Sequence, residues 1–164
     1  MAAGSTYTPI ATTTVGSAVS SLTFSSLGSY TDIIIVCNGT GGGSSNDSSI
    51  LIQFNADTGS NYSSVYLLGN GSSASSGLIN PATAIFSMRI NGTTNSTGIA
   101  HVMNYSNSST YKTVLSRGNS PQYAIALAGT WRSTAAITSI KLLEQNGGNF
   151  QTGFTTTLYG IAAA

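Results

Sequence analysis

The sequence is poor in charge. Five basic and four acidic residues make up only 5% of its 164 residues, against about 25% in an ordinary soluble domain. The basic residues are scattered and the formal net charge is +1, so the clustered positive footprint that nucleic-acid binding needs is missing. We therefore expect no nucleic-acid partner. Copies of such a chain also repel one another only weakly.

Carboxylates are scarce in particular. Asp32, Asp47, Asp57 and Glu144 are the four acidic residues, and each stands alone in its segment. A glycosidase needs two carboxyl groups about 5–9.5 Å apart. Only a tertiary pairing could bring two of these acids together, and because Asp32 flanks a strand and Asp47 lies in a predicted loop, we expect no catalytic residues and predict that the chain is not an enzyme.

The chain has one histidine and one cysteine. His101 shares a predicted strand face with Ile99 and Met103, which favours a packed or edge histidine over a general base. A zinc site needs about three or four ligands, so we expect no metal and no cofactor. Cys37 has no partner for an internal disulfide, and its apolar surroundings predict a small buried side chain in a chain that folds in a reducing cytoplasm.

Long apolar runs are missing as well. No apolar run approaches the ~20 residues of a membrane-spanning helix, and the first residues show no basic region followed by an apolar core. We therefore expect neither a membrane partner nor a secretory signal.

The most apolar stretch is Thr31–Asn38. Ile33 to Cys37 are apolar and mostly β-branched, which is typical of a strand covered on both faces, because successive side chains point to opposite sides. Other segments alternate polar and apolar residues, Thr83–Ile90 most clearly. With turns spaced about 8–12 residues apart, the pattern predicts an all-β fold. We expect an antiparallel, jelly-roll-like β-sandwich of about ten strands, one domain over residues 15–164.

Two polar stretches, Asn38–Ser49 and Asn70–Pro81, are predicted to be exposed loops. In Gln122–Trp131, three alternating alanines share one face, which indicates close approach of another layer or another chain. Candidate edge strands carry few of the charges that usually guard such edges. We therefore predict that a partner covers them in a symmetric oligomer or a lattice.

Two patterns have competing interpretations. Asn55, Asp57, Gly59 and Asn61 imitate the alternating oxygen ligands of a calcium loop, but the acid at position twelve and the flanking helices are absent, so we favour a turn. Five tyrosines could stack on a sugar, although a place at the core edge or an interface suits these amphipathic rings better. They are Tyr62, Tyr66, Tyr105, Tyr111 and Tyr123.

Four stretches carry a resemblance that covers nearly the whole chain. They are STYTPIATTTVGSAVSSLTFSSLGSYTDIIIVCNGT, QFNADTGSNYSSVYLLGNGSSASS, MNYSNSSTYKTVLSRGN and GTWRSTAAITSIKLLEQNGGNFQTGFTTTLYGI. In this order they resemble small virion surface proteins of tailed bacteriophages, cyanophages among them. The resemblance implies a virion structural role and gives no catalytic residues to carry over.

From the resemblance and the uncharged edges we expect a capsid decoration (cement) protein, made in the host bacterial cytoplasm. It would sit on the capsid surface of the virion as a homotrimer that contacts the major capsid protein. Residues 1–14, an N-terminal arm with the first strand, are the predicted docking segment. The alternative is a tail-fibre or receptor- or carbohydrate-binding module. The residues expected at an interface are Tyr7, Pro9, Ile10, Trp131 and Arg132.

Overall fold

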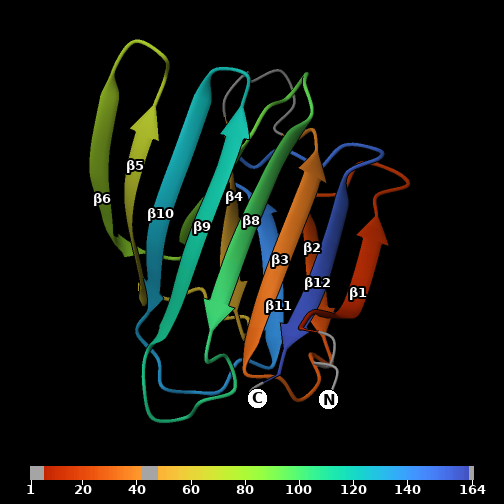
Figure 1. Ribbon diagram of the computed structural model, residues 1–164, viewed down its shortest axis with the longest axis vertical. Coiled ribbons are helices and arrows are strands. Elements are labelled where there is room, and N and C mark those ends of the chain that lie inside the picture. Colours follow the sequence, from red (N-terminus) through yellow and green to blue (C-terminus); the bar gives the residue numbers. More distant parts are fainter. Residues whose placement is uncertain (1–5, 42–47, 163–164) are drawn as a thin grey trace.

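The computed structural model describes residues 6–41 and 48–162, and these form twelve strands in two stacked antiparallel sheets with no helix among them. Figure 1 shows the larger sheet in front of the smaller one. The predicted all-β sandwich is confirmed, with two strands more than expected. The strands are β1 (Thr8–Thr14), β2 (Ser21–Ser25), β3 (Asp32–Gly39), β4 (Ser48–Phe54), β5 (Tyr62–Gly69), β6 (Ala74–Ala82), β7 (Ile85–Ile90), β8 (Ser96–Met103), β9 (Lys112–Ser120), β10 (Tyr123–Trp131), β11 (Ser139–Glu144) and β12 (Thr155–Ile161).

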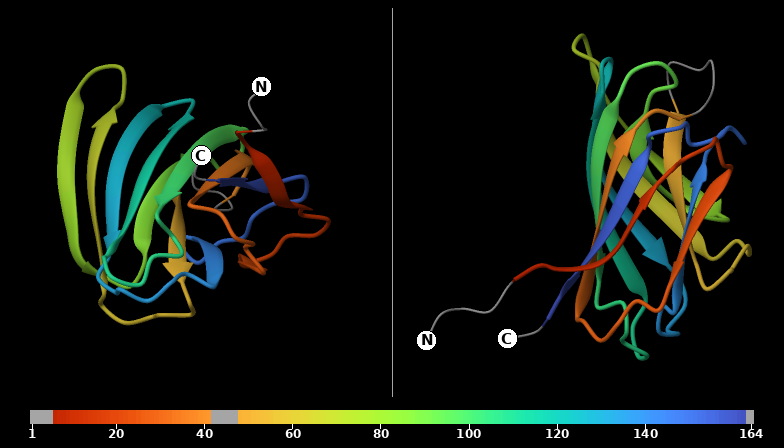
Figure 2. Two further views of the ribbon diagram at one scale, coloured as in Figure 1. Left: turned by 60° about the horizontal axis from the view of Figure 1, so that its bottom comes forward. Right: turned by 90° about the vertical axis from the view of Figure 1, so that its right-hand side faces the viewer.

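The two sheets differ in size. The eight-stranded sheet has the order β1-β12-β3-β8-β9-β10-β5-β6, and the four-stranded sheet has the order β2-β11-β4-β7. Figure 2 shows the two layers from other directions. The larger sheet extends beyond the smaller one, because eight strands at about 4.8 Å spacing are twice as wide as four. Its edges are β1 and β6. Within the described residues, no helix is long and apolar enough to cross a membrane.

The core lies between the sheets and is filled by the alternate residues that face inward. On β3, Ile33, Ile35 and Cys37 are at most 1% exposed. Burial raises the pKa of the Cys37 thiol to about 12, although a hydrogen bond with Thr156 works in the other direction. The predicted buried, free cysteine is confirmed, and its thiolate is strongly disfavoured.

The outer face of β3 differs from the prediction. β3 is an interior strand, paired with β12 on one side and β8 on the other. Ile34 is 9% exposed, however, and Val36 is half-buried. The described residues therefore cover one face of this strand with a second sheet and leave the other face without one.

Two stretches predicted to be loops belong in part to strands. The stretch Asn70–Pro81 was expected to be a loop, but most of it belongs to β6, which pairs with β5 along its length. The serines and the glycine of β6 are typical of a loop, so the sequence did not indicate a strand there. An exposed edge strand needs little alternation of polar and apolar residues. Half of the predicted loop Asn38–Ser49, residues 42–47, lies outside the described residues, and its two ends belong to β3 and β4 instead of a loop.

The N-terminal segment is part of the sheet. β1 pairs with β12 from Thr8 opposite Gly160 to Thr14 opposite Thr155. Thr8–Thr14 is therefore an edge strand of the sandwich rather than a separate arm, and residues 1–5 lie outside the described part. This pairing moves the domain boundary to a point before β1.

Candidate functional site

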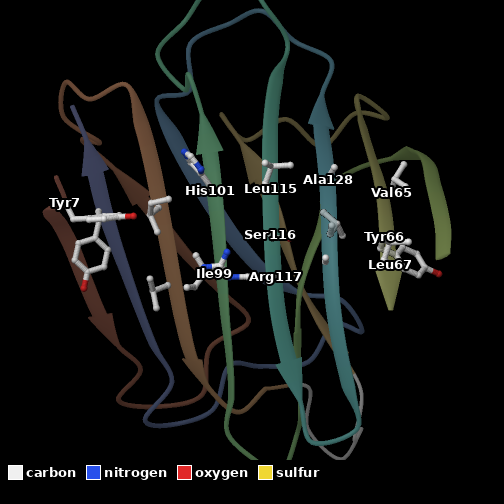
Figure 3. A pocket seen from close by; sticks show the side chains of 15 residues that line it. Tyr7, Val65, Tyr66, Leu67, Ile99, His101, Leu115, Ser116, Arg117 and Ala128 are labelled. Atoms are coloured by element: carbon white, nitrogen blue, oxygen red, sulfur yellow. The ribbon is translucent and has the colours of Figure 1, made fainter. Parts of the chain in front are cut away.

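The site is the outer face of the eight-stranded sheet, the face that points away from the four-stranded sheet. It is hollowed, with a volume of about 820 Å³. Figure 3 shows side chains from neighbouring strands gathered over this hollow. Its lining comes from six strands and from Tyr7, which precedes β1.

The strand register orders the outer face into rows, because residues directly opposite each other lie on the same side of a sheet. Two central rows cross all eight strands. The first row is Pro9, Tyr159, Ile34, His101, Leu115, Ala128, Val65 and Leu78. The second row is Thr12, Thr157, Val36, Ile99, Arg117, Ala126, Leu67 and Ser76.

Polar rows border the central rows at both ends of the strands. On one side, Asn38, Thr97 and Asn119 lie opposite one another, and Asn38 Nδ2 donates to Thr97 Oγ1 over 2.6 Å. On the other side, Thr113 and Thr130 are opposite one another. The outer face thus has a mostly apolar centre and a polar margin, which is the composition of a protein–protein interface.

Several large apolar side chains of the central rows are open to solvent. The exposed fractions are 52% for Val65, 63% for Leu67, 64% for Leu78 and 46% for Leu115. The three alanines of β10 are exposed on the same face. An exposed apolar patch of this kind marks a binding surface, whereas single exposed leucines would not.

The outer face carries two groups of opposite formal charge. Arg117 is exposed and forms no hydrogen bond or ion pair with any residue that the structure describes. Asp32 stands alone in its segment of the sequence but lies close to His101 in space, with 2.7 Å between its Oδ2 and His101 Nε2. Its Oδ1 accepts the Asn104 backbone N–H, also over 2.7 Å. The cross-strand neighbours of His101 are Ile34 and Leu115, neither of which has a hydroxyl for the histidine to activate.

Three of the five predicted interface residues lie in or next to β1, and two of them, Tyr7 and Pro9, are exposed. Tyr7 is 54% exposed and packs edge-to-face on Tyr159, with ring centroids 6.2 Å apart. Pro9 is exposed opposite Tyr159, whereas Ile10 is partly buried against the core. Tyr7 and Pro9 are therefore accessible to a partner.

The other two predicted interface residues serve the fold. Trp131 is 3% exposed and stacks on Tyr62, with ring centroids 6.2 Å apart. The prediction of Trp131 as an interface residue is wrong, because the inward side of β10 places it in the core. The Arg132 guanidinium donates to the Ser60 and Tyr62 carbonyl oxygens over 2.7 and 3.1 Å, and to Asn80 Oδ1. It joins neighbouring segments of the chain.

The calcium-like segment is a turn, as favoured. The Asp57 carboxylate accepts hydrogen bonds from Gly59 N, Asn61 Nδ2 and Trp131 Nε1. Asn55 Oδ1 accepts from the backbone N–H groups of Thr138 and Ser139 at the start of β11. These oxygens already bind protein donors. Among the described residues, no group of three or more His, Cys, Asp or Glu side chains could hold a metal ion.

The five tyrosines do not form a sugar platform. Tyr62 and Tyr105 are 0% and 2% exposed. Tyr66 and Tyr123 are half-buried, and Tyr66 packs on the core residue Phe86. Tyr111 alone among the five is well exposed. A core-edge role is confirmed for most of these rings, while Tyr7 and Tyr159, which the sugar hypothesis did not include, face the hollow.

The chain matches no protein-family model and no curated protein. Among solved structures it is similar to an exo-inulinase from Aspergillus awamori, with a TM-score of 0.52 and 14% identity. The alignment covers 94% of this chain and 29% of that one, so the chain spans less than a third of its length. A protein of unknown function from Shewanella oneidensis MR-1 aligns over 82% of this chain and 60% of its own at 11% identity, with a TM-score of 0.20.

The similarity to the exo-inulinase concerns the fold alone, and it corrects one expectation. The scarcity of carboxylates led us to predict that the chain is not an enzyme. A sandwich of the same fold occurs within a protein that is one. That prediction is therefore overturned, since this fold does not place a chain outside the enzymes.

Proposed function

We propose that this chain is a structural protein of a bacteriophage virion, a capsid decoration (cement) protein on the outside of the head. The observation that carries the proposal is the exposed outer face, with its two central rows and polar margin. The resemblance of the sequence to small phage virion surface proteins supplies the setting. The protein acts there as a homo-oligomer, which we expect to be a trimer, bound to the major capsid protein.

The physical basis of cementing is added contact area. Covering a large apolar side chain contributes roughly 1.5–3 kcal/mol, and four such side chains are about half-exposed or more on the outer face. Only part of that gain survives the entropy lost on association. Contacts of this type between copies that are bound at joints of the capsid resist separation of the capsid subunits under internal pressure.

The N-terminal segment is the proposed contact with the major capsid protein. Tyr7, which precedes β1, and Pro9, which lies in β1, are exposed at the edge of the sandwich. As an edge strand, β1 also has backbone groups on one side that no described strand uses, and such edges readily accept a further chain.

The test is reconstitution of heads that lack the protein. Deletion of residues 1–7 spares β1, whereas deletion of residues 1–14 would remove the strand that covers β12. We expect the shorter deletion to keep the melting temperature of the full chain and to lose most head occupancy, measured by quantitative mass spectrometry and immunogold imaging. The matched control is Tyr111→Ala, which changes a tyrosine of similar exposure away from β1. Unchanged occupancy refutes the docking role, and label on tails alone refutes the decoration role.

The second candidate is a tail-fibre or receptor- or carbohydrate-binding module. The observation that favours it is the hollow itself, because about 820 Å³ lies within the ~300–1,000 Å³ typical of ligand sites. Tyr7 and Tyr159 supply rings at one end, and Arg117 supplies hydrogen-bond donors. This candidate predicts saturable binding of the isolated chain to host-surface glycans. Tyr159→Ala should abolish that binding, and Tyr111→Ala should leave it unchanged.

A further inference from the structure

We infer that the outer face is covered by another copy of this chain. The inference rests on the proposed function, in which the face is buried in an assembly, and it names the partner at that surface. Four observations support it.

The first observation is the mismatch on β3. Its continuous apolar run is typical of a strand buried on both faces, yet the second sheet covers only the inner face, and Val36 on the outer face remains partly exposed. Ile34 and Val36 instead face the hollow, next to Ile99 of β8. A layer of protein from another chain would bury the outer face of β3, as the apolar run of this strand favours.

The second observation is the area available. Eight strands at about 4.8 Å spacing give a width of about 38 Å, and the central rows with their polar borders extend about 20 Å along the strands. The face therefore measures roughly 760 Å², close to the ~800 Å² that each partner contributes to a stable interface. The face is large enough to hold two copies together.

The third observation is the charge. Arg117 has no described partner, and Asp32 is the acidic group on the same face, with a side chain that is 20% exposed. The two opposite charges leave the face with no excess of one sign that would keep copies apart. A second copy also brings a carboxylate that can face Arg117 and a guanidinium that can face Asp32, so the surface complements itself.

The fourth observation is the distribution of side chains. Val65, Leu67 and Leu78 make the β5–β6 end of the face the most exposed. The opposite end, around Ile34, is largely covered. The exposed end of one copy can therefore lie over the hollow of the next. Made reciprocally, this contact closes a pair by a two-fold axis, whereas made in one direction only, from each copy to the next, it closes a ring by a three-fold axis.

The experiment measures the mass of the full chain in solution by sedimentation velocity across a concentration series. The main variant is Ala128→Glu, which places a charge in the first central row where it would be buried without a partner. The matched control is Ala135→Glu, the same change at an exposed position in the segment after β10. A second variant, Leu67→Ser, removes apolar area without adding charge. Thermal melts verify that each variant is folded.

We expect the unaltered chain and Ala135→Glu to form the same dimer or trimer. Ala128→Glu should weaken association by about 100-fold or more, as isolating a charge in an interface does, and Leu67→Ser by about 10-fold. The inference is overturned if the unaltered chain is a monomer at concentrations on the order of 100 micromolar. It is also overturned if Ala128→Glu associates as tightly as the unaltered chain. Head occupancy is measured separately. A monomer that still decorates heads refutes self-association alone, and an oligomer absent from virions refutes the proposed function alone.

Discussion

Replacing Trp131 with phenylalanine tests whether this side chain stabilises the core, as its position indicates. The substitution removes the hydrogen bond from Nε1 to Asp57 Oδ2, 2.7 Å long, and keeps a ring that can pack on Tyr62. A hydrogen bond to a charged group contributes about 1.5–3 kcal/mol, and the missing ring atoms leave a cavity that adds about 1 kcal/mol. We therefore expect the free energy of unfolding to fall by about 2.5–4 kcal/mol. For a domain of this size the melting temperature should drop by about 5–16 °C.

The pH dependence gives this prediction a second readout. Burial alone would raise the pKa of the Asp57 carboxyl, but hydrogen bonds from Trp131, Asn61 and Gly59 outweigh it and hold the pKa below its ordinary value of 3.8. A carboxyl with a lowered pKa in the folded state stabilises the fold above its ordinary pKa, and this contribution disappears as the pH falls through the lowered value. The difference in free energy of unfolding between the unaltered chain and Trp131→Phe should thus be largest at pH 7 and should shrink below about pH 4.

Urea denaturation at neutral and acidic pH measures both effects. Tyr111→Phe is the control, since that ring is 58% exposed and its change should cost little. A double-mutant cycle with Asp57→Asn isolates the contribution of the hydrogen bond. The reasoning fails if Trp131→Phe melts like the unaltered chain, or if it dissociates an oligomer without destabilising its subunits.

Three further predictions follow from buried positions. Gly129→Ala would drive its new methyl group into Ile85 across the core, so thermal melting should show a loss of about 1–3 kcal/mol, whereas Gly69→Ala, with open space around it, should change little. Burial lowers the pKa of the Lys112 ammonium, which donates to two backbone carbonyls over 2.8 and 3.1 Å. A lysine with a lowered pKa in the folded state destabilises the fold at low pH, so the free energy of unfolding should rise as the pH approaches 10.5. Urea titrations at several pH values should show that Lys112→Met lacks this part of the rise. An equal rise in both chains would contradict the lowered pKa of Lys112. The thiol of Cys37, with a pKa of about 12, should resist iodoacetamide at pH 8 in the folded chain and react at once in denaturant; rapid native labelling, read by mass spectrometry, would show that the strand opens.

The alternation of residues was enough to predict most strands and the sandwich, because a strand with one buried face repeats every two residues. It was not enough for β6. That strand lies at an edge, its side chains are mostly polar or small, and its pairing with β5 depends on backbone groups that every sequence has. The assignment of Trp131 to an interface failed for a related reason, because a large ring at the end of a strand can point to either face, and only the register shows which.

The candidate site was predicted only in fragments. The apolar run of β3 and the alanines of β10 each indicated an additional layer, and both lie on the outer face. These residues form rows across eight strands only because of the order of the strands in the sheet. No local sequence pattern encodes that order. The same holds for Asp32 and His101, which are 69 positions apart in the chain and 2.7 Å apart in space.

The pairing of the first strand with the last has a practical consequence. Thr8 at the start of β1 lies opposite Gly160 near the end of β12, so polypeptide joined before β1 and polypeptide joined after β12 leave the sandwich at neighbouring points, about 5 Å apart. A carrier protein could therefore receive the whole sandwich inside one of its surface loops, with little distortion of its own backbone. In such a fusion protein, β6 at the opposite edge of the sheet would remain exposed. The sandwich is therefore suited to insertion into the surface protein of another particle.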